Sequence, residues 1–358
     1  MSISTERECM AQEAIILRQG TAHLIMAIAP YSLALPARTI IEWRRLEGNM
    51  ETKGDHSTRS RPDNPVEELY ASCRGLAFSI AYRMLGAVSD AEDVVQDVFA
   101  DMAGRDLSEV RNRKAYIAKW VTNRCLNILQ SARRTREAYP GEWLPEPLAA
   151  SGEQPDQLAE RADSLSYAYL VMLERLTPVE RAVLLLREAF EYDYEEIADI
   201  VGKSVPNCRK ILSRAKEHAR APSPSAPAGE AATRRSALVA RFMSAFQHYD
   251  VEALLELLAE DAVLITDGGP HVRAAMRPLT GQSRVMKLLS SRKTFAAMRH
   301  SPPIITDVNG EPNAVYLDQG AVRAVCCFML TPDQERILQV YIILNPDKLD
   351  HLARKQGS

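Results

Sequence analysis

Long apolar runs and cysteine pairs of the zinc-binding kind are missing from this chain of 358 residues. Its six cysteines show no Cys-x-x-Cys spacing and no matching histidine spacing, which excludes the usual zinc sites and gives no sign of a disulfide framework. We therefore expect small buried thiols in a reducing cytoplasm, with neither a metal nor a cofactor. Because no segment is long and apolar enough to span a bilayer, no membrane attachment is expected.

The net charge of −3 does not suggest a nucleic-acid-binding protein, but the charges are strongly segregated. Residues 111–136 contain eight lysines or arginines and no acidic residue, whereas residues 88–101 contain five acidic residues and no basic one. One such block is usually a solvated helix face. Two opposed blocks on adjacent helices instead predict two partners of opposite charge.

Residues 1–61 differ from the rest of the chain. An apolar stretch at 24–37 follows Arg18 and weakly imitates a signal peptide, but nothing downstream requires an oxidising compartment. A second methionine, Met50, lies a few residues before the first well-patterned helix. We expect a poorly structured extension that is translated from an upstream start codon.

Residues 64–136 show helical periodicity. Apolar side chains recur three and four residues apart between Leu69 and Met84, and Gly86 is expected to end that helix. Ser89 is the predicted N-cap of the next helix, whose acidic first turn complements the positive helix end. A basic, aromatic helix then runs to Arg136, so one all-α domain is predicted.

The linker at 137–161 contains the string Trp143-Leu144-Pro145-Glu146-Pro147. A large apolar side chain in a proline-rich linker normally needs a surface to pack against. Packing of Trp143 against its own neighbouring helix is as good an interpretation as docking on a distant surface.

A second all-α domain is predicted at 162–220, and its last part has the pattern of a helix-turn-helix. Gly202 supplies the turn, Ser204 the N-cap, and Pro206 part of the first turn of the second helix. The outer face of that helix carries Asn207 together with arginine and lysine side chains, which suit base edges and phosphates. The alternative is an ordinary helical hairpin with a solvated basic face.

The pattern changes after a proline-rich linker at 221–233. Two amphipathic helices broken near Asp250 precede a strand at 262–266, which ends in a turn at 267–270. Further strands are predicted at 314–317, 322–330 and 336–344. Helices followed by a run of antiparallel strands predict an α+β cone or half-barrel over 234–358.

These motifs resemble those of the extracytoplasmic-function (ECF) type of sigma-70 factor. The acidic helix, the basic helix, and two later strings are similar to its polymerase-binding and promoter-reading domains: Thr177-Pro178-Val179-Glu180-Arg181 and Tyr194-Glu195-Glu196-Ile197-Ala198. The C-terminal part resembles the SnoaL-like (NTF2-like) fold found in one subgroup. Three strings support this: the one at 143–147, Asp267-Gly268-Gly269, and Asn345-Pro346-Asp347-Lys348-Leu349. Pro270 departs from the expected further glycine, and residues 1–60 have no counterpart.

The resemblance covers about residues 64–352 and implies two all-α sigma domains followed by an α+β SnoaL-like cone. On the acidic helix, the residues expected to bind core RNA polymerase are Asp90, Glu92, Asp93, Gln96 and Asp97. The residues expected to contact the −10 promoter element are Arg111, Asn112, Arg113, Lys114, Tyr116, Lys119, Trp120, Asn123, Arg124, Arg133 and Arg134. Stacking on a base and packing in the core are equal alternatives for Trp120.

The residues expected to contact the −35 element are Ser204, Pro206, Asn207, Arg209, Lys210, Ser213 and Arg214. The residues of the three strings are expected to be regulatory: Trp143, Leu144, Pro145, Glu146, Pro147, Asp267, Gly268, Gly269, Asn345, Pro346, Asp347, Lys348 and Leu349. They are expected to hold the factor in a compact state without a separate anti-sigma factor. A small molecule in the C-terminal pocket is the trigger we consider.

The chain is thus predicted to direct RNA polymerase to promoters under the control of its own C-terminal domain. Two alternatives stay open. One is a helix-turn-helix transcription regulator whose SnoaL-like domain binds or converts a small molecule, against which the acidic helix argues. The other is an enzyme that uses Asp267, His271 or His300 as acid or base, although no catalytic grouping at a recognisable spacing supports it.

Overall fold

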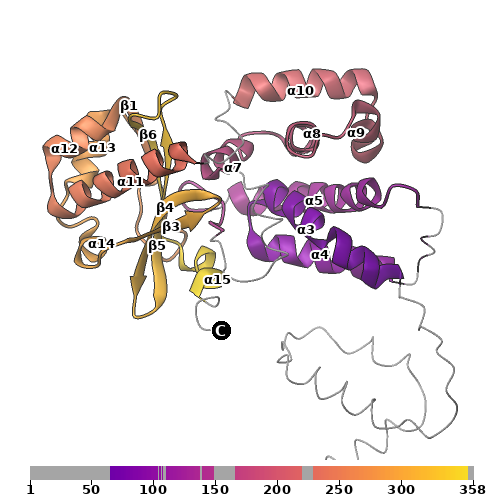
Figure 1. Ribbon diagram of the computed structural model, residues 1–358, viewed down its shortest axis with the longest axis horizontal. Helices are drawn as coiled ribbons and strands as arrows, with labels where there is room; N and C mark the ends of the chain where they lie inside the picture. The colour runs from indigo at the N-terminus through magenta and orange to yellow at the C-terminus, as the bar shows by residue number, and fades with distance from the viewer. Residues whose placement is uncertain are drawn as a thin grey trace, which may run out of the picture. The chain divides into compact units, whose positions relative to one another are not determined.

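The computed structural model describes residues 65–353, with gaps at 104, 106, 108–109, 138, 149–165 and 220–228. The extension predicted at 1–61 and most of both linkers lie outside the described residues. Two helical domains are followed by an α+β domain, as predicted (Figure 1). Within the described ranges, no helix combines the length and apolar character needed to cross a bilayer.

The first helical domain contains α3 (Pro65–Leu85), α4 (Val88–Met102) and α5 (Arg113–Glu137), whose apolar faces share one core. Gly86 ends α3 at a φ of +70°, as predicted. The prediction that Ser89 caps the next helix is wrong. Helix α4 begins at Val88 and its N-cap position is Ala87, which has no side-chain acceptor. The acceptor comes from the linker, which the local sequence does not reveal.

The second helical domain contains α7 (Tyr167–Leu173), α8 (Pro178–Glu188), α9 (Tyr194–Val201) and α10 (Val205–Ala219). The side chains of Thr177 and Glu180 form a capping box at the start of α8. Asp193 and Glu196 form a second one at α9. Gly202 takes the left-handed conformation between α9 and α10, which confirms the helix-turn-helix.

The α+β domain begins with α11 (Glu230–His248) and α12 (Val251–Leu257), separated at Asp250, which caps α12. Its shorter helices are α13 (Gln282–Leu289), α14 (Ala296–His300), the 3₁₀ helix η2 (Pro346–Lys348) and α15 (Asp350–Ala353). Its strands are β1 (Leu258–Asp267), β2 (Leu279–Thr280), β3 (Ile304–Val308), β4 (Glu311–Asp318), β5 (Ala321–Leu330) and β6 (Ile337–Ile343).

The strands form one sheet in the order β2-β1-β6-β5-β4-β3. Two features differ from the prediction. Strands β2 and β3 were not expected, because β2 has only two residues and β3 is mostly exposed or half-exposed at the sheet edge. The expected run of antiparallel strands is also interrupted, since β1 and β6 pair in parallel, with Leu264 opposite Val340.

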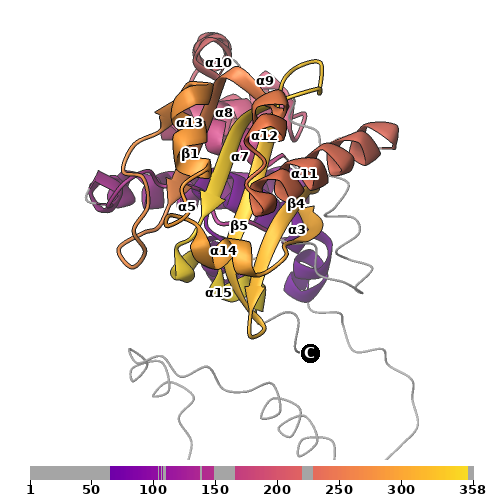
Figure 2. The same ribbon diagram turned by 90° about the vertical axis from the view of Figure 1, so that its left-hand side faces the viewer.

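Both faces of this sheet are buried. Helices α11 to α14 lie on one face, where Cys326 and Phe328 of β5 belong to their core (Figure 2). Val325 and Cys327 of the same strand point to the other face, which packs against α7, α15 and the linker residue Leu144. A strand buried on both sides reads as a continuous apolar run, which is the pattern of β5 from Ala324 to Leu330. The α+β domain is therefore joined to the linker and the second helical domain by a shared core.

Candidate functional site

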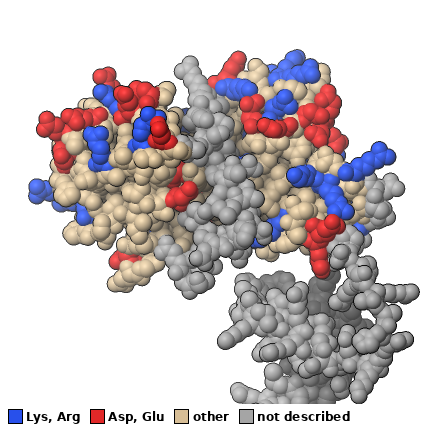
Figure 3. Space-filling view, viewed as in Figure 1, with Lys and Arg blue, Asp and Glu red and all other residues tan. Residues whose placement is uncertain are grey.

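The acidic face of α4 lies open to solvent. The five side chains predicted to bind polymerase are all exposed: Asp90, Glu92, Asp93, Gln96 and Asp97. The valines between them are buried. Asp97 forms an ion pair with Arg124 of α5. Acidic and basic side chains also lie next to one another over the helical domains in Figure 3.

The residues predicted to contact the −10 element lie just before α5 and along it. Six of them are exposed: Arg111, Asn112, Arg113, Lys114, Asn123 and Arg124. Tyr116, Lys119 and Trp120 are half-buried, and the side chains of Arg133 and Arg134 lie outside the described part of the chain. The Trp120 ring packs at the edge of the core, with the Arg105 guanidinium 4.5 Å from its centre. It lines a groove of about 860 Å³ between α5 and α9.

The first helix of the helix-turn-helix occupies part of that α5 surface. Nζ of Lys119 lies 2.8 Å from a carboxylate oxygen of Asp199 on α9. Asn112 donates to Glu196 at 3.2 Å, and Asn123 donates to the Ile200 carbonyl at 3.2 Å. Three residues predicted to contact the promoter are thus bound to α9 in this conformation.

The outer face of α10 remains accessible. All residues predicted for the −35 element are exposed: Ser204, Pro206, Asn207, Arg209, Lys210, Ser213 and Arg214. The ring of Tyr194 on α9 contacts two guanidinium groups, with its centre 5.0 Å from that of Arg187 and 5.1 Å from that of Arg209. The contact with the ring favours Arg209 side-chain conformations that lie against Tyr194.

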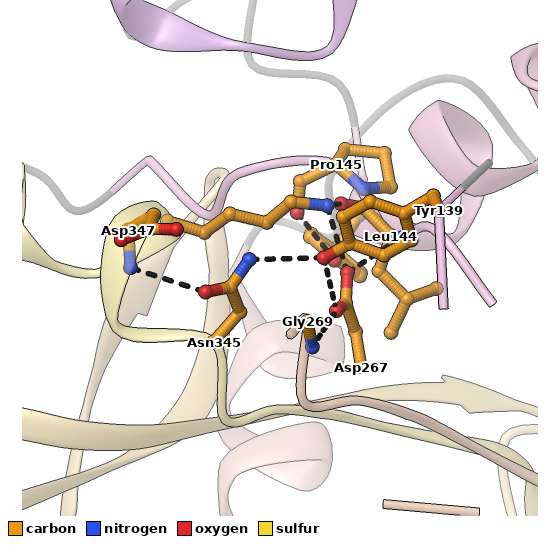
Figure 4. Close-up of polar contacts among 9 residues, drawn as sticks. Tyr139, Leu144, Pro145, Asp267, Gly269, Asn345 and Asp347 are labelled. Atoms are coloured by element: carbon orange, nitrogen blue, oxygen red, sulfur yellow. Dashed lines mark hydrogen bonds and ion pairs between the residues drawn. The ribbon is translucent and has the colours of Figure 1, made fainter. Parts of the chain in front are cut away.

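Side chains of the α+β domain form hydrogen bonds with the linker backbone at Leu144 (Figure 4). The carboxylate of Asp267, at the end of β1, accepts from the Leu144 N–H at 2.9 Å. The Leu144 carbonyl accepts from Nζ of Lys348, which also lies 2.7 Å from Asp267. Both side chains and Leu144 are buried, so this contact lies inside the protein and not at its surface.

The other oxygen of Asp267 is used as well. It accepts from the Tyr139 hydroxyl at 2.7 Å and from the Gly269 N–H at 3.0 Å. Asn345 donates to the same Tyr139 hydroxyl at 2.9 Å. Burial and the Asp267 carboxylate, which accepts the Tyr139 hydrogen bond, raise the Tyr139 pKa, whereas the bond donated by Asn345 opposes that rise.

The glycines of the turn after β1 are required by close neighbours. A Cβ at Gly268 would lie 2.0 Å from the Val272 carbonyl oxygen. One at Gly269, where φ is +56°, would lie 2.5 Å from the Asn345 side chain. Pro270 is exposed beyond them. The turn thus brings the string at 267–269 and the string at 345–349 into contact.

Trp143 contacts two domains. Its ring centre lies 3.9 Å from Nζ of Lys348, and its ring also packs over Gly86, where a Cβ would lie 2.8 Å from Cη2. Docking on a distant surface is therefore the correct interpretation of this side chain. It places the linker between the α+β domain and the α3–α4 turn.

The remaining backbone groups of 144–148 are also bound. The Pro145 carbonyl accepts from the Tyr167 hydroxyl, and the Pro147 carbonyl contacts the His351 ring. The Glu146 N–H donates to the Gly86 carbonyl, and the Glu146 carbonyl accepts from the Tyr82 hydroxyl. The N–H and carbonyl of Leu148 are both bound to Asn309. Every N–H and carbonyl of this segment thus has a partner. We call 144–148 with these partners the linker clasp. Tyr82, Tyr139, Tyr167 and Asn309 were not predicted, since no local spacing marks them.

The proposed acid–base residues of the enzyme alternative do not form a joint site. Asp267 is engaged in the clasp. His271 is exposed and 3.3 Å from Asp347, while the exposed His300 lies on α14 against its own helix backbone. Within the described residues, no group of three or more His, Cys, Asp or Glu side chains is arranged to hold a metal.

Comparison with known families identifies both helical domains. The family models for sigma-70 region 2 and sigma-70 region 4 match residues 69–135 and 166–218. The ECF RNA polymerase sigma factor SigJ of Mycobacterium tuberculosis is 28% identical over 291 residues, which cover 78% of this chain and 91% of the relative. The ECF sigma factor SigG of M. tuberculosis is 29% identical over 334 residues, covering 85% and 81%. The crystal structure of M. tuberculosis SigJ matches with a TM-score of 0.61 at 26% identity, covering 79% of this chain and 97% of that one.

Proposed function

Because the chain belongs to the ECF sigma-70 family and directs RNA polymerase to promoters, we propose that its own α+β domain restrains it through the linker clasp. Its partners are core RNA polymerase and promoter DNA. The acidic face of α4 is the proposed polymerase contact, and α5 and α10 are the proposed −10 and −35 contacts. In this proposal, no separate anti-sigma factor is required.

The position of α9 supports this proposal most directly. Lys119, Asn112 and Asn123 cannot hold the −10 element while they are bound to Asp199, Glu196 and Ile200 of α9. Transcription initiation therefore requires the helical domains to separate. The clasp opposes that separation because it binds the linker that joins them. A small molecule bound by the α+β domain would act by loosening the clasp.

The α+β domain is not an enzyme in this proposal. Sigma factors select promoters and catalyse no reaction of their own. Asp267, the strongest candidate for catalysis, instead has both carboxylate oxygens committed to the linker and its own turn. In the clasp, Asp267 acts as a positioned hydrogen-bond acceptor.

Run-off transcription with purified core polymerase tests the proposal. The double variant Asp267→Asn/Lys348→Met removes both charged groups that bind the backbone of Leu144. Its fold is checked before transcription is measured. We expect more promoter-specific transcript per molecule of factor than with the wild type. Equal or lower activity of a folded variant would contradict the restraint. Arg323→Met/Asp318→Asn, an exposed ion pair between β4 and β5, is the matched control.

A further inference from the structure

Helix α4 begins without a cap of its own. Ala87 has φ −127° and ψ 134°, the extended conformation of an N-cap residue, but its methyl group accepts no hydrogen bond. The first N–H groups of a helix need acceptors from elsewhere. Oε2 of Glu146 accepts from the Val88 N–H at 2.7 Å, so a linker carboxylate takes the place of the cap.

The same linker residue is fixed to the α3–α4 turn by its backbone. The Glu146 N–H donates to the Gly86 carbonyl at 2.8 Å, and the Tyr82 hydroxyl donates to the Glu146 carbonyl at 2.7 Å. Glu146 is half-buried, and burial raises its pKa, an effect that the Val88 N–H at the positive end of α4 opposes. Glu146 is thus bound to the first helical domain on three sides.

We propose that Glu146 is a positioning residue for polymerase binding, because it orders the first turn of α4, which carries Asp90 and leads into the other acidic side chains. This rests on the proposed function, which takes α4 as the polymerase-binding helix. The clasp then has two sides with opposite effects. The contacts to Tyr82, Gly86 and Val88 favour polymerase binding, whereas the contacts to the α+β domain restrain the factor. Release separates the α+β domain from the linker and leaves Glu146 on α4.

Affinity of the full-length chain for core polymerase tests this role. Glu146→Ala leaves the first turn of α4 uncapped, so we expect about three- to tenfold weaker binding, the range that loss of an N-cap produces. Amide hydrogen exchange at 88–91 should become faster, with the rest of α4 unchanged. Adding Ala87→Ser supplies a local cap and should restore both. Glu142→Ala, in the same linker, is the matched control and should bind like the wild type.

Two results would overturn the proposal. One is a Glu146→Ala chain that binds core polymerase like the wild type. The other is a Glu146→Ala chain whose transcription rises as in Asp267→Asn/Lys348→Met, which would make Glu146 only a part of the restraint. Failure of the proposed function is distinguishable, because it is read from the transcription of Asp267→Asn/Lys348→Met and not from the affinity of Glu146→Ala.

Discussion

Asp267 and Lys348 bind the backbone N–H and the backbone carbonyl of Leu144, and they also bind each other. The carboxylate accepts from the Leu144 N–H, the ammonium group donates to its carbonyl, and the two charges lie 2.7 Å apart. The side chains are only 0% and 6% exposed. A buried ion pair contributes little net stability, because desolvation offsets the attraction. We infer that this pair mainly specifies where the linker lies.

Removal of one partner should therefore be costly. Asp267→Asn leaves the Lys348 ammonium group buried without its counter-charge, and Lys348→Met leaves the Asp267 carboxylate buried without its counter-charge. Each single variant should lower the free energy of unfolding by about 3–5 kcal/mol. The double variant should be no less stable than either single variant, so its loss falls well short of the sum of the two. Urea unfolding of the four chains measures this coupling. Strictly additive losses would show that the pair does not act as a unit.

Asp199 should compete with promoter DNA for Lys119. The ion pair is exposed, so it is worth about 0.5 kcal/mol. Asp199→Asn should raise the affinity of the free factor for a single-stranded −10 oligonucleotide about two- to threefold, measured by fluorescence anisotropy. Glu195→Gln removes an exposed charge from the same helix and serves as control. An equal rise in the control would mean that only net charge matters.

Arg209 and Lys210 should differ in what they contribute at the −35 element. We predict that Arg209, which packs against Tyr194, makes bidentate contact with a base, so Arg209→Ala should reduce the preference for the matched duplex by about 1–3 kcal/mol. Lys210→Ala should weaken all duplexes alike and reduce the salt slope by about 1. Binding titrations at several salt concentrations separate the two. A uniform loss with Arg209→Ala would contradict its assignment to a base.

Glu311 should make the stability of the chain depend on pH. Burial raises its pKa to about 7, against the opposing effects of Arg235 and of the Tyr167 N–H. The folded state then holds this proton more tightly than the unfolded chain. The resulting stability is fully present below the ordinary pKa of 4.5 and is lost as the pH rises through about 7.

The free energy of unfolding should consequently fall more between about pH 5 and pH 7.5 in the wild type than in Glu311→Gln. Urea unfolding at both values measures the difference between the chains. The amide of the variant still accepts from Arg235 but does not titrate. Parallel falls in the two chains would exclude Glu311 as the source.

Local patterns in the sequence predicted much of the helical fold. The capping box of Thr177 and Glu180, the turn at Gly202 and the helix break at Asp250 each depend on residues within a few positions of one another. The same holds for the exposed acidic face of α4, since charge and apolar periodicity decide it within fifteen residues. Strand pairing was less accessible, because β1 finds its parallel partner β6 across most of the domain.

The clasp could be predicted only in part. Three strings pointed to it through resemblance, but their chemistry depends on partners far away in the chain. Val88 and Glu146 are 58 residues apart, and Asn309 reaches Tyr82 across 227. A cap that is missing at Ala87 and supplied from a linker leaves no mark in the local sequence. The error at Ser89 has this origin.

Hydrogen exchange at three linker amides tests the central claim most directly. The N–H groups of Leu144 and Leu148 are bound by Asp267 and Asn309 of the α+β domain, whereas that of Glu146 is bound by Gly86 of the first helical domain. When core polymerase and promoter DNA bind the full-length factor, Leu144 and Leu148 should exchange faster while Glu146 stays protected. Unchanged protection at Leu144 and Leu148 in an initiating complex would contradict restraint through the clasp.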